Sequence, residues 1–143
     1  MNRELIVNAT PKGVGIALLE NKELVELYNE ESGKQFTVGD IYLGRVTKLV
    51  AGLNAAFVDV GYEKDAFLHY TDLGPKIRTA MKVAQSAIAG NLTDPLLTNL
   101  QFEKEILKTG KMPEVLDKRQ PILVQVLKEP ISTKGPRLSC ELS

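Results

Sequence analysis

Residues 40–73 constrain the fold of this chain more than any other stretch of its sequence. The stretch contains three short runs rich in β-branched and aromatic residues, at 41–50, 55–60 and 66–70. The breaks between them, at 51–54 and 61–64, contain glycine and polar residues, which is typical of turns between strands. The stretch therefore predicts three short strands joined by two turns.

Two phenylalanines fall on the polar faces of neighbouring predicted strands. Side chains alternate between the two faces of a strand, so the residues that share a face follow from their spacing. The apolar sets that must face a core are Ala56, Val58 and Val60 in one strand and Ala66, Leu68 and Tyr70 in the next. Phe57 and Phe67 have the opposite parity, which they share with Asp59, Asp65 and His69. Either both rings lie under another segment as core, as most phenylalanine does, or they form a surface on which unpaired bases stack.

Several motifs follow one another in order along the chain. They are Y-L-G-R-V, L-N-A-A-F-V-D-V-G, A-F-L-H and, near the end, V-Q-V-L-K-E-P-I-S-T-K-G-P-R-L-S. In these motifs the chain resembles the N-terminal region of the RNase E/G family over nearly its whole length, apart from a divergent middle. The F-L-H-Y-T-D-L and T-K-G-P-R-L blocks are most similar to the ribonuclease G branch.

The resemblance implies a mainly β fold with a helical insertion. Residues 38–143 would form an S1-type RNA-binding domain, which is an OB-fold barrel of five strands. Residues 1–37 would form a β-meander from a split RNase-H-like subdomain, and the sequence predicts its strands at 3–9, 14–20 and 23–29. Three such strands are only marginally stable alone. We therefore expect the meander to need a packing partner, which in the family lies partly beyond Ser143.

Residues 75–115 are an insertion in the predicted barrel, well above the usual loop length. Apolar residues recur there at helical spacing, at Ile77, Met81, Ala84 and Ile88. Gly90 is placed to end that helix, and Asp94 and Pro95 are typical of the start of a second helix that would end near Gly110. We expect a helical hairpin that caps one open end of the barrel, with a dedicated RNA or partner site as the alternative.

The last two barrel strands are predicted at 121–128 and 137–142. In the final strand, Leu138, Cys140 and Leu142 would face inward and Arg137, Ser139 and Glu141 outward. Cys140 is therefore expected to be a small core residue.

Composition places the chain among soluble globular domains. Its 143 residues are 43% hydrophobic and 25% charged, enough for one sizeable core. The 18 basic and 18 acidic residues cancel, so RNA binding would need a local basic patch. The single cysteine permits no internal disulfide, and no apolar run is long enough to span a bilayer. We expect a soluble, cytoplasmic protein.

The resemblance assigns RNA contact to residues inside the shared motifs. Phe57 and Phe67 match the family's RNA-contacting aromatic residues. Lys134 matches the lysine of the K-G motif, and Lys128 matches the lysine that precedes that loop. His69 would stack or hydrogen-bond at the same surface.

Two arginines are further candidates for RNA contact. Arg45 and Arg137 are predicted on the outward faces of strands taken to be neighbours, with ordinary solvated charges as the alternative. Leu43 stands where several relatives carry a lysine, so that phosphate contact is not expected here.

The sequence does not supply the combination of residues that a catalytic or zinc site would need. His69 and Cys140 are the only histidine and cysteine, so neither a Ser-His pair with its orienting group nor a zinc site can be completed. Aspartates on the predicted strands and turns, at Asp59, Asp65 and Asp72, are expected to be solvated rather than magnesium ligands. We predict no catalytic residue, metal site or cofactor in this chain. The resemblance implies magnesium-assisted hydrolysis in a later domain of the full-length enzyme.

The first hypothesis is therefore the RNA-binding part of a ribonuclease G/E-like endoribonuclease that acts in RNA processing and decay. The chain starts naturally and stops inside a predicted strand, so we expect it to be part of that longer enzyme, and to be monomeric or weakly self-associating. Its expected partners are single-stranded RNA and the rest of the parent chain, with no membrane. A freestanding OB-fold RNA binder of translation or transcription, and an OB-fold that binds only protein, are the alternatives.

Overall fold

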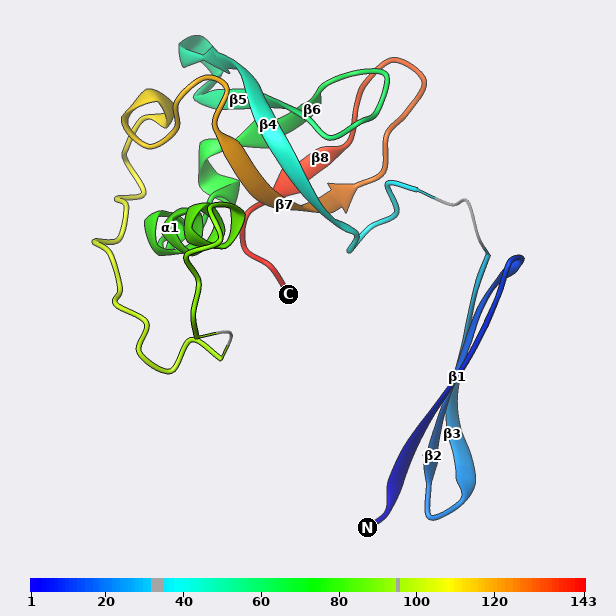
Figure 1. Cartoon of the computed structure of the whole chain (residues 1–143). Coiled ribbons are helices and arrows are strands. Elements are labelled where there is room, and N and C mark those ends of the chain that lie inside the picture. The colour runs from blue at the N-terminus through cyan, green and yellow to red at the C-terminus, as the bar shows by residue number, and fades with distance from the viewer. Residues whose placement is uncertain (32–34, 95) are drawn as a thin grey trace. The chain divides into compact units, whose positions relative to one another are not determined.

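The computed structural model describes residues 1–31, 35–94 and 96–143 (Figure 1). The chain divides into two compact units, Met1–Gln35 and Phe36–Ser143, each built on its own β-sheet. Part of the polar segment between the predicted meander and barrel, residues 32–34, lies outside the described residues.

The first unit is an antiparallel sheet of three strands in the order β1-β2-β3. The strands are β1 (Arg3–Thr10), β2 (Gly13–Glu20) and β3 (Glu23–Glu31), which confirms the three predicted strands to within two residues at each end. Asn21 and Lys22 both have positive φ, as the two central residues of a tight hairpin turn require.

Both faces of this small sheet carry exposed apolar side chains. Leu5 and Val7 pair with Leu18 and Ile16 and so share one face with them, while Ile6 lies on the opposite face. Leu5 is 66% exposed and Leu27, on β3, is 69% exposed. A sheet of three strands gains little stability when neither face is covered, because it buries too little apolar surface.

We therefore expect the first unit to exchange its backbone amides with solvent faster than the barrel does. Hydrogen exchange read by mass spectrometry on the intact chain would compare peptides from β1–β3 with peptides from the barrel strands. Self-association through a sheet face would slow exchange in the first unit only as the protein concentration rises. Equally slow exchange in both units of a strictly monomeric protein would contradict the prediction.

The second unit contains a closed barrel of five strands. These are β4 (Ile41–Val50), β5 (Ala55–Asp59), β6 (Ala66–His69), β7 (Pro121–Lys128) and β8 (Arg137–Ser139). Their order is β4-β5-β6-β8-β7, with β7 closing onto β4, and only the β6–β8 pair is parallel. This arrangement is an OB-fold, which confirms the predicted fold class.

The barrel core follows the alternation predicted from the sequence. Ala56, Val58, Ala66, Leu68 and Tyr70 are buried, and Val60 is partly buried against the core. Cys140 is also buried, as predicted, and burial raises the pKa of its thiol to about 12. The thiol therefore stays protonated at neutral pH and serves as a small core side chain.

The prediction for the last strand is wrong beyond Ser139. The strand β8 ends there because the chain turns onto the 3₁₀ turn η2 (Tyr70–Asp72): the Ser139 hydroxyl and the Cys140 N–H both donate to the Asp72 carbonyl, at 3.2 and 2.9 Å. Ser139 is consequently buried rather than outward-facing, and Leu142 is 43% exposed rather than inward-facing.

The insertion contains the first predicted helix but not the second. Helix α1 (Ile77–Ile88) matches the predicted spacing, and Gly90, at a φ of 75°, ends it. Within 96–110 the described residues form turns and extended chain rather than a helix. The Asp94 carboxylate accepts hydrogen bonds from the Thr98 hydroxyl and from the backbone N–H groups of Leu96, Thr98 and Asn99, an arrangement that competes with helix formation. Pro95, predicted as the first helical position, lies outside the described residues.

The insertion packs into the barrel core from one end. Ile77 in α1, Met112 in the 3₁₀ turn η3 (Met112–Glu114), and Leu116 are buried in the same cluster as the barrel strands. The Asn54 side chain fixes this segment, because its amide donates to the Gly110 carbonyl and its oxygen accepts the Met112 N–H. The predicted cap is therefore present, built from one helix and an irregular segment. It lies across the barrel from the β5–β6 and β7–β8 loops (Figure 1).

Within the described part of the chain, no helix combines the length and apolar character that crossing a membrane requires.

Candidate nucleic-acid interface

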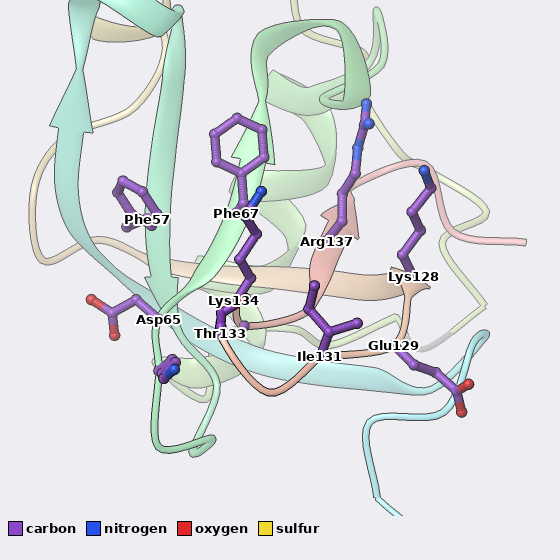
Figure 2. Close-up of a pocket in the computed structure, with 11 residues that line it drawn as sticks. Phe57, Asp65, Phe67, Lys128, Glu129, Ile131, Thr133, Lys134 and Arg137 are labelled. Atoms are coloured by element: carbon purple, nitrogen blue, oxygen red, sulfur yellow. The ribbon is translucent and has the colours of Figure 1, made fainter.

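A groove on the outer surface of the barrel brings together most of the predicted site residues. It encloses a cavity of about 810 Å³. The described residues that line it come from 57–67 and 128–137, that is, from β5, β6, β8, the end of β7 and the two adjoining loops. We call this cavity the aromatic groove (Figure 2).

One cross-strand row of side chains crosses the aromatic groove. Phe57 on β5 pairs with Phe67 on β6, Phe67 pairs with Arg137 on β8, and Arg137 pairs with Lys128 on β7. The row therefore runs from two aromatic rings to two cations (Figure 2). It depends on the register of four strands, so only Phe57 and Phe67, which lie on consecutive strands, could be placed together from spacing.

The two phenylalanine rings contact each other edge to face. Their centroids are 5.9 Å apart and their planes are inclined at 68°. Both side chains are half-buried, and the insertion lies elsewhere on the barrel, so they do not lie beneath it. The alternative that both rings are core residues under the insertion is therefore wrong, because both rings line the open groove.

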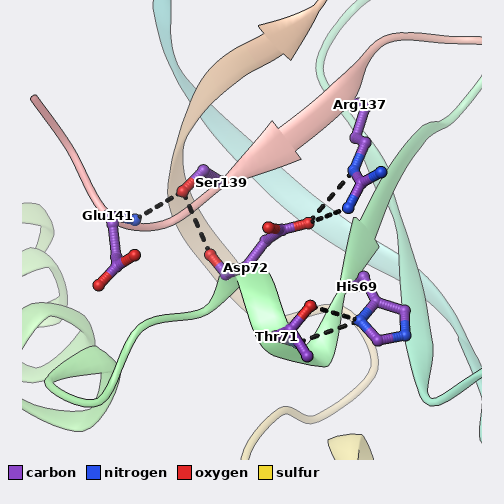
Figure 3. Close-up of polar contacts among 6 residues, drawn as sticks. All are labelled: His69, Thr71, Asp72, Arg137, Ser139 and Glu141. Atoms are coloured by element: carbon purple, nitrogen blue, oxygen red, sulfur yellow. Dashed lines mark hydrogen bonds and ion pairs between the residues drawn. The ribbon is translucent and has the colours of Figure 1, made fainter.

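His69 extends the row of rings along β6. Its ring centroid lies 6.4 Å from that of Phe67, with the planes inclined at 38°. Its Nδ1 accepts the Thr71 N–H at 3.1 Å and lies 2.8 Å from the Thr71 hydroxyl oxygen (Figure 3). Because a backbone N–H donates to Nδ1, the neutral imidazole carries its proton on Nε2. That N–H can donate to a ligand.

Four cationic side chains line the aromatic groove, of which Lys128, Lys134 and Arg137 were predicted and Lys64 was not. Lys64 donates from Nζ to the Ser132 carbonyl at 2.8 Å, so it links the β5–β6 loop to the β7–β8 loop. The chain as a whole has no net charge. The groove nevertheless has a local excess of cations, since its acidic residues are Asp65 and Glu129.

Arg137 is anchored rather than freely solvated. Its Nε and Nη2 atoms donate to one oxygen of Asp72, at 3.2 and 2.9 Å (Figure 3). The Arg137 side chain is 42% exposed and that of Asp72 is 20% exposed. Asp72, predicted to be a solvated carboxylate, instead holds the guanidinium beside the groove. A partly exposed ion pair of this kind adds little stability, but it restricts where the charge lies.

Arg45 is not among the described residues that line the aromatic groove. The prediction that it neighbours Arg137 is wrong, because β7 separates β4 from β8 on one side of the barrel and β5 and β6 separate them on the other. Arg45 donates to the Arg119 carbonyl at 2.7 Å and so fastens the segment between the insertion and β7 to β4. Leu43 is exposed and pairs with Leu123 on β7.

The two loops beside the groove approach each other at Gly135. A Cβ atom at this position would lie 2.3 Å from the Asp65 carbonyl oxygen and 2.8 Å from that of Lys64, which no real Cβ does. Two hydrogen bonds between Ile131 and Lys134, both of 3.1 Å, close the tip of the β7–β8 loop. Together with the Lys64–Ser132 bond, this contact makes the two loops one continuous wall.

The sequence of the chain was compared with those of known proteins. It is 36% identical over 140 residues to ribonuclease G of Haemophilus influenzae and 33% identical over 143 residues to ribonuclease G of Escherichia coli. It is 34% identical over 137 residues to ribonuclease E of a Nostoc species. These alignments cover 98%, 100% and 90% of this chain. No protein-family model matches it.

This chain belongs to the ribonuclease E/G family. It spans about 25% of the length of the two ribonuclease G relatives and 16% of the ribonuclease E relative. The predicted family is thereby confirmed.

The described residues of this family member do not gather a metal-binding set. No group of three or more histidine, cysteine, aspartate or glutamate side chains lies close enough together to hold an ion in 1–31, 35–94 and 96–143. The aspartates considered from the sequence have other contacts. Asp59 accepts the Gly61 N–H, Asp65 accepts the Thr47 hydroxyl, and Asp72 binds Arg137.

Replacing Gly135 by alanine is expected to lower the free energy of unfolding by about 1–3 kcal/mol, because the added methyl group forces the Asp65 and Lys64 carbonyls away. Thermal or urea unfolding would measure the change. Gly52→Ala is the matched control, since a Cβ there meets nothing within 4 Å. Equal stability of the two variants would show that the loops are not tied together at Gly135.

Proposed function

We propose that this chain is the RNA-binding part of a ribonuclease G/E-like endoribonuclease. It holds single-stranded RNA in the aromatic groove while a nuclease domain outside this chain cuts, as part of RNA processing and decay in the cytoplasm. The observation that carries the proposal is the row from Phe57 and Phe67 to Arg137 and Lys128, which sets two half-buried rings beside two cations. The relatives are ribonucleases by name, and an OB-fold of S1 type is a common support for single-stranded RNA.

The residues that line the groove, and His69 beside Phe67, have separate roles in this proposal. Phe57 and Phe67 each stack one base, and His69 stacks or donates from Nε2 next to them. Lys134, Lys128 and Arg137 meet phosphates, the lysines as mobile point charges and Arg137 from a fixed position beside Asp72. Base stacking needs no particular base, so recognition of this kind tolerates many sequences.

The chemistry of cleavage belongs to the rest of the parent protein in this proposal. Magnesium is the expected metal of the full-length enzyme. In this proposal the ion is held by residues outside this chain. This chain's own contribution is to hold and orient the strand.

The proposal is tested by titrating labelled single-stranded RNA and a duplex of the same sequence against the protein. We expect measurable binding to the single strand and much weaker binding to the duplex, whose paired bases cannot lie on the rings. Failure to bind the single strand at low salt would overturn the proposal.

Lys134→Ala is expected to weaken binding to all single-stranded sequences alike, because a phosphate contact carries no sequence information. The slope of log affinity against log salt should become shallower by about 0.7 for each lost contact. Titrations at several salt concentrations measure this slope. Lys118→Ala removes an exposed lysine outside the groove and is the control. If the slope were the same for both variants, Lys134 would not contact a phosphate.

A further inference from the structure

Residues of the 3₁₀ turn η2 form hydrogen bonds both to a residue of the aromatic groove and to the insertion. On the groove side, the Asp72 carboxylate accepts hydrogen bonds from Nε and Nη2 of Arg137 (Figure 3). On the other side, the Tyr70 hydroxyl donates to the Leu107 carbonyl, in the insertion. Tyr70 and Asp72 are the first and last residues of this three-residue turn, so a displacement of one also displaces the other.

The insertion encloses the Tyr70 hydroxyl closely. Tyr70 is 3% exposed and belongs to the barrel core. The Leu107 carbonyl that accepts its hydroxyl also accepts the Gly110 N–H, at 3.1 Å. A Cβ atom at Gly110 would lie 2.1 Å from the hydroxyl oxygen, so the chain approaches Tyr70 here as only glycine allows.

The Tyr70 hydroxyl makes the only hydrogen bond between η2 and the described residues of 96–110. A cavity of about 330 Å³ lies beside this bond, lined on one side by Tyr70 and Thr71 and on the other by residues 106–108. Because side chains do not fill this cavity, packing restrains the turn less there than in a close-packed interior. The hydrogen bond of Tyr70 is therefore what fixes η2 against the insertion.

The position of η2 matters for binding because arginine has many rotamers. A free arginine loses conformational entropy when it binds a phosphate, whereas one that is already held loses less. Arg137 is held by Asp72, and its side chain is still 42% exposed and lines the groove. A shift of the turn would release the guanidinium and so weaken its contact with a ligand.

We propose that Tyr70 is a positioning residue for RNA binding. Its bond to the insertion holds η2 where Asp72 keeps Arg137 ready to meet a phosphate. This inference rests on the proposed RNA-binding function. It gives the insertion a role in RNA affinity, although the described residues that line the groove include none from 75–115.

The first test needs no RNA and uses proton–nitrogen NMR of the whole chain. Tyr70→Phe removes the hydroxyl and keeps the ring in the core. We expect the Nε–H resonance of Arg137 to move toward that of a free arginine and to exchange faster with water. Tyr28→Phe is the matched control, because it removes an exposed hydroxyl in the first unit. An unchanged Arg137 resonance in Tyr70→Phe would overturn the proposal.

A second variant perturbs the same bond from the insertion. Gly110→Ala pushes the Tyr70 hydroxyl away without changing any residue of η2 or of the groove. The Arg137 resonance should move as in Tyr70→Phe. Met112→Ala removes buried contacts of the insertion but no hydrogen bond to η2, so it should leave that resonance in place. If Met112→Ala moved the resonance equally, general loosening of the insertion would be the cause and the proposal would be wrong.

RNA titration then separates this proposal from the proposed function. Tyr70→Phe should weaken binding of single-stranded RNA by about two- to tenfold, the cost of ordering one long side chain. In an Arg137→Ala background it should have no further effect, since no guanidinium is left to position. Equal losses in both backgrounds would overturn the role of Tyr70 and leave RNA binding intact. Failure of the parent protein to bind RNA would overturn the proposed function, whereas the NMR comparison tests the coupling of Tyr70 to Arg137 independently.

Discussion

Alanine in place of Phe57 or Phe67 is expected to weaken binding of single-stranded RNA by about 5- to 150-fold, which corresponds to about 1–3 kcal/mol for each ring that stacks a base. The expected loss of folding stability is smaller. Each ring is half-buried and contacts the other edge to face, so its removal should cost about 1–2 kcal/mol, against about 3–5 kcal/mol for a fully buried phenylalanine.

These two effects are measured separately by RNA titration and by thermal or urea unfolding. Phe102→Ala is the matched control, because Phe102 is 68% exposed and lies in the insertion, outside the aromatic groove. It should change neither quantity appreciably. The stacking role is wrong if Phe57→Ala and Phe67→Ala both lose the stability of a core residue while their folded fractions bind RNA as the parent does.

Met112→Ala is expected to have the opposite profile, with a large loss of stability and unchanged RNA affinity of the folded protein. Met112 is fully buried in the cluster that joins the insertion to the barrel. Truncation of a buried methionine costs about 2–5 kcal/mol, since it removes apolar contacts and leaves a cavity. The insertion lies across the barrel from the β5–β6 and β7–β8 loops, which line the groove, so the proposed RNA contacts should not change (Figure 1).

Urea unfolding with a matched variant in the same insertion tests this prediction. Leu96→Ala removes a side chain that is 82% exposed, so its cost should stay within about 0.5 kcal/mol. If Met112→Ala were as stable as Leu96→Ala, the insertion would be a surface appendage and not part of the barrel core.

The sequence was sufficient to predict which side chains of β5 and β6 face the core, because apolar and polar residues alternate along these two strands. Val58 and Leu68 are fully buried, while Phe57 and Phe67, one residue earlier in each strand, line the surface groove, as a period of two requires. Local signals also located α1, through its apolar spacing and Gly90. The order and closure of the strands came from the family resemblance and not from periodicity.

The predictions that failed concern interactions between distant parts of the chain or competing local hydrogen bonds. Asp94 resembles a helix N-cap, yet its carboxylate binds several nearby donors in a turn that does not continue as a helix. The hydrogen bond from the Thr98 hydroxyl lowers the pKa of this carboxyl. The ion pair of Arg137 with Asp72 joins residues 65 positions apart. The end of β8 at Ser139 likewise depends on the distant Asp72 carbonyl, so spacing within the strand could not reveal it.

The contact of the two loops at Gly135 has a consequence for the kinetics of binding. When loops become ordered only on ligand binding, the loss of their conformational entropy weakens the complex, and the rearrangement slows association. Here the β5–β6 and β7–β8 loops are already fastened to each other by backbone contact and by the Lys64–Ser132 hydrogen bond. An RNA strand entering the groove would therefore associate at a rate set by diffusion and by attraction to the lysines. Differences in affinity between RNA sequences would then arise mainly from differences in their dissociation rates.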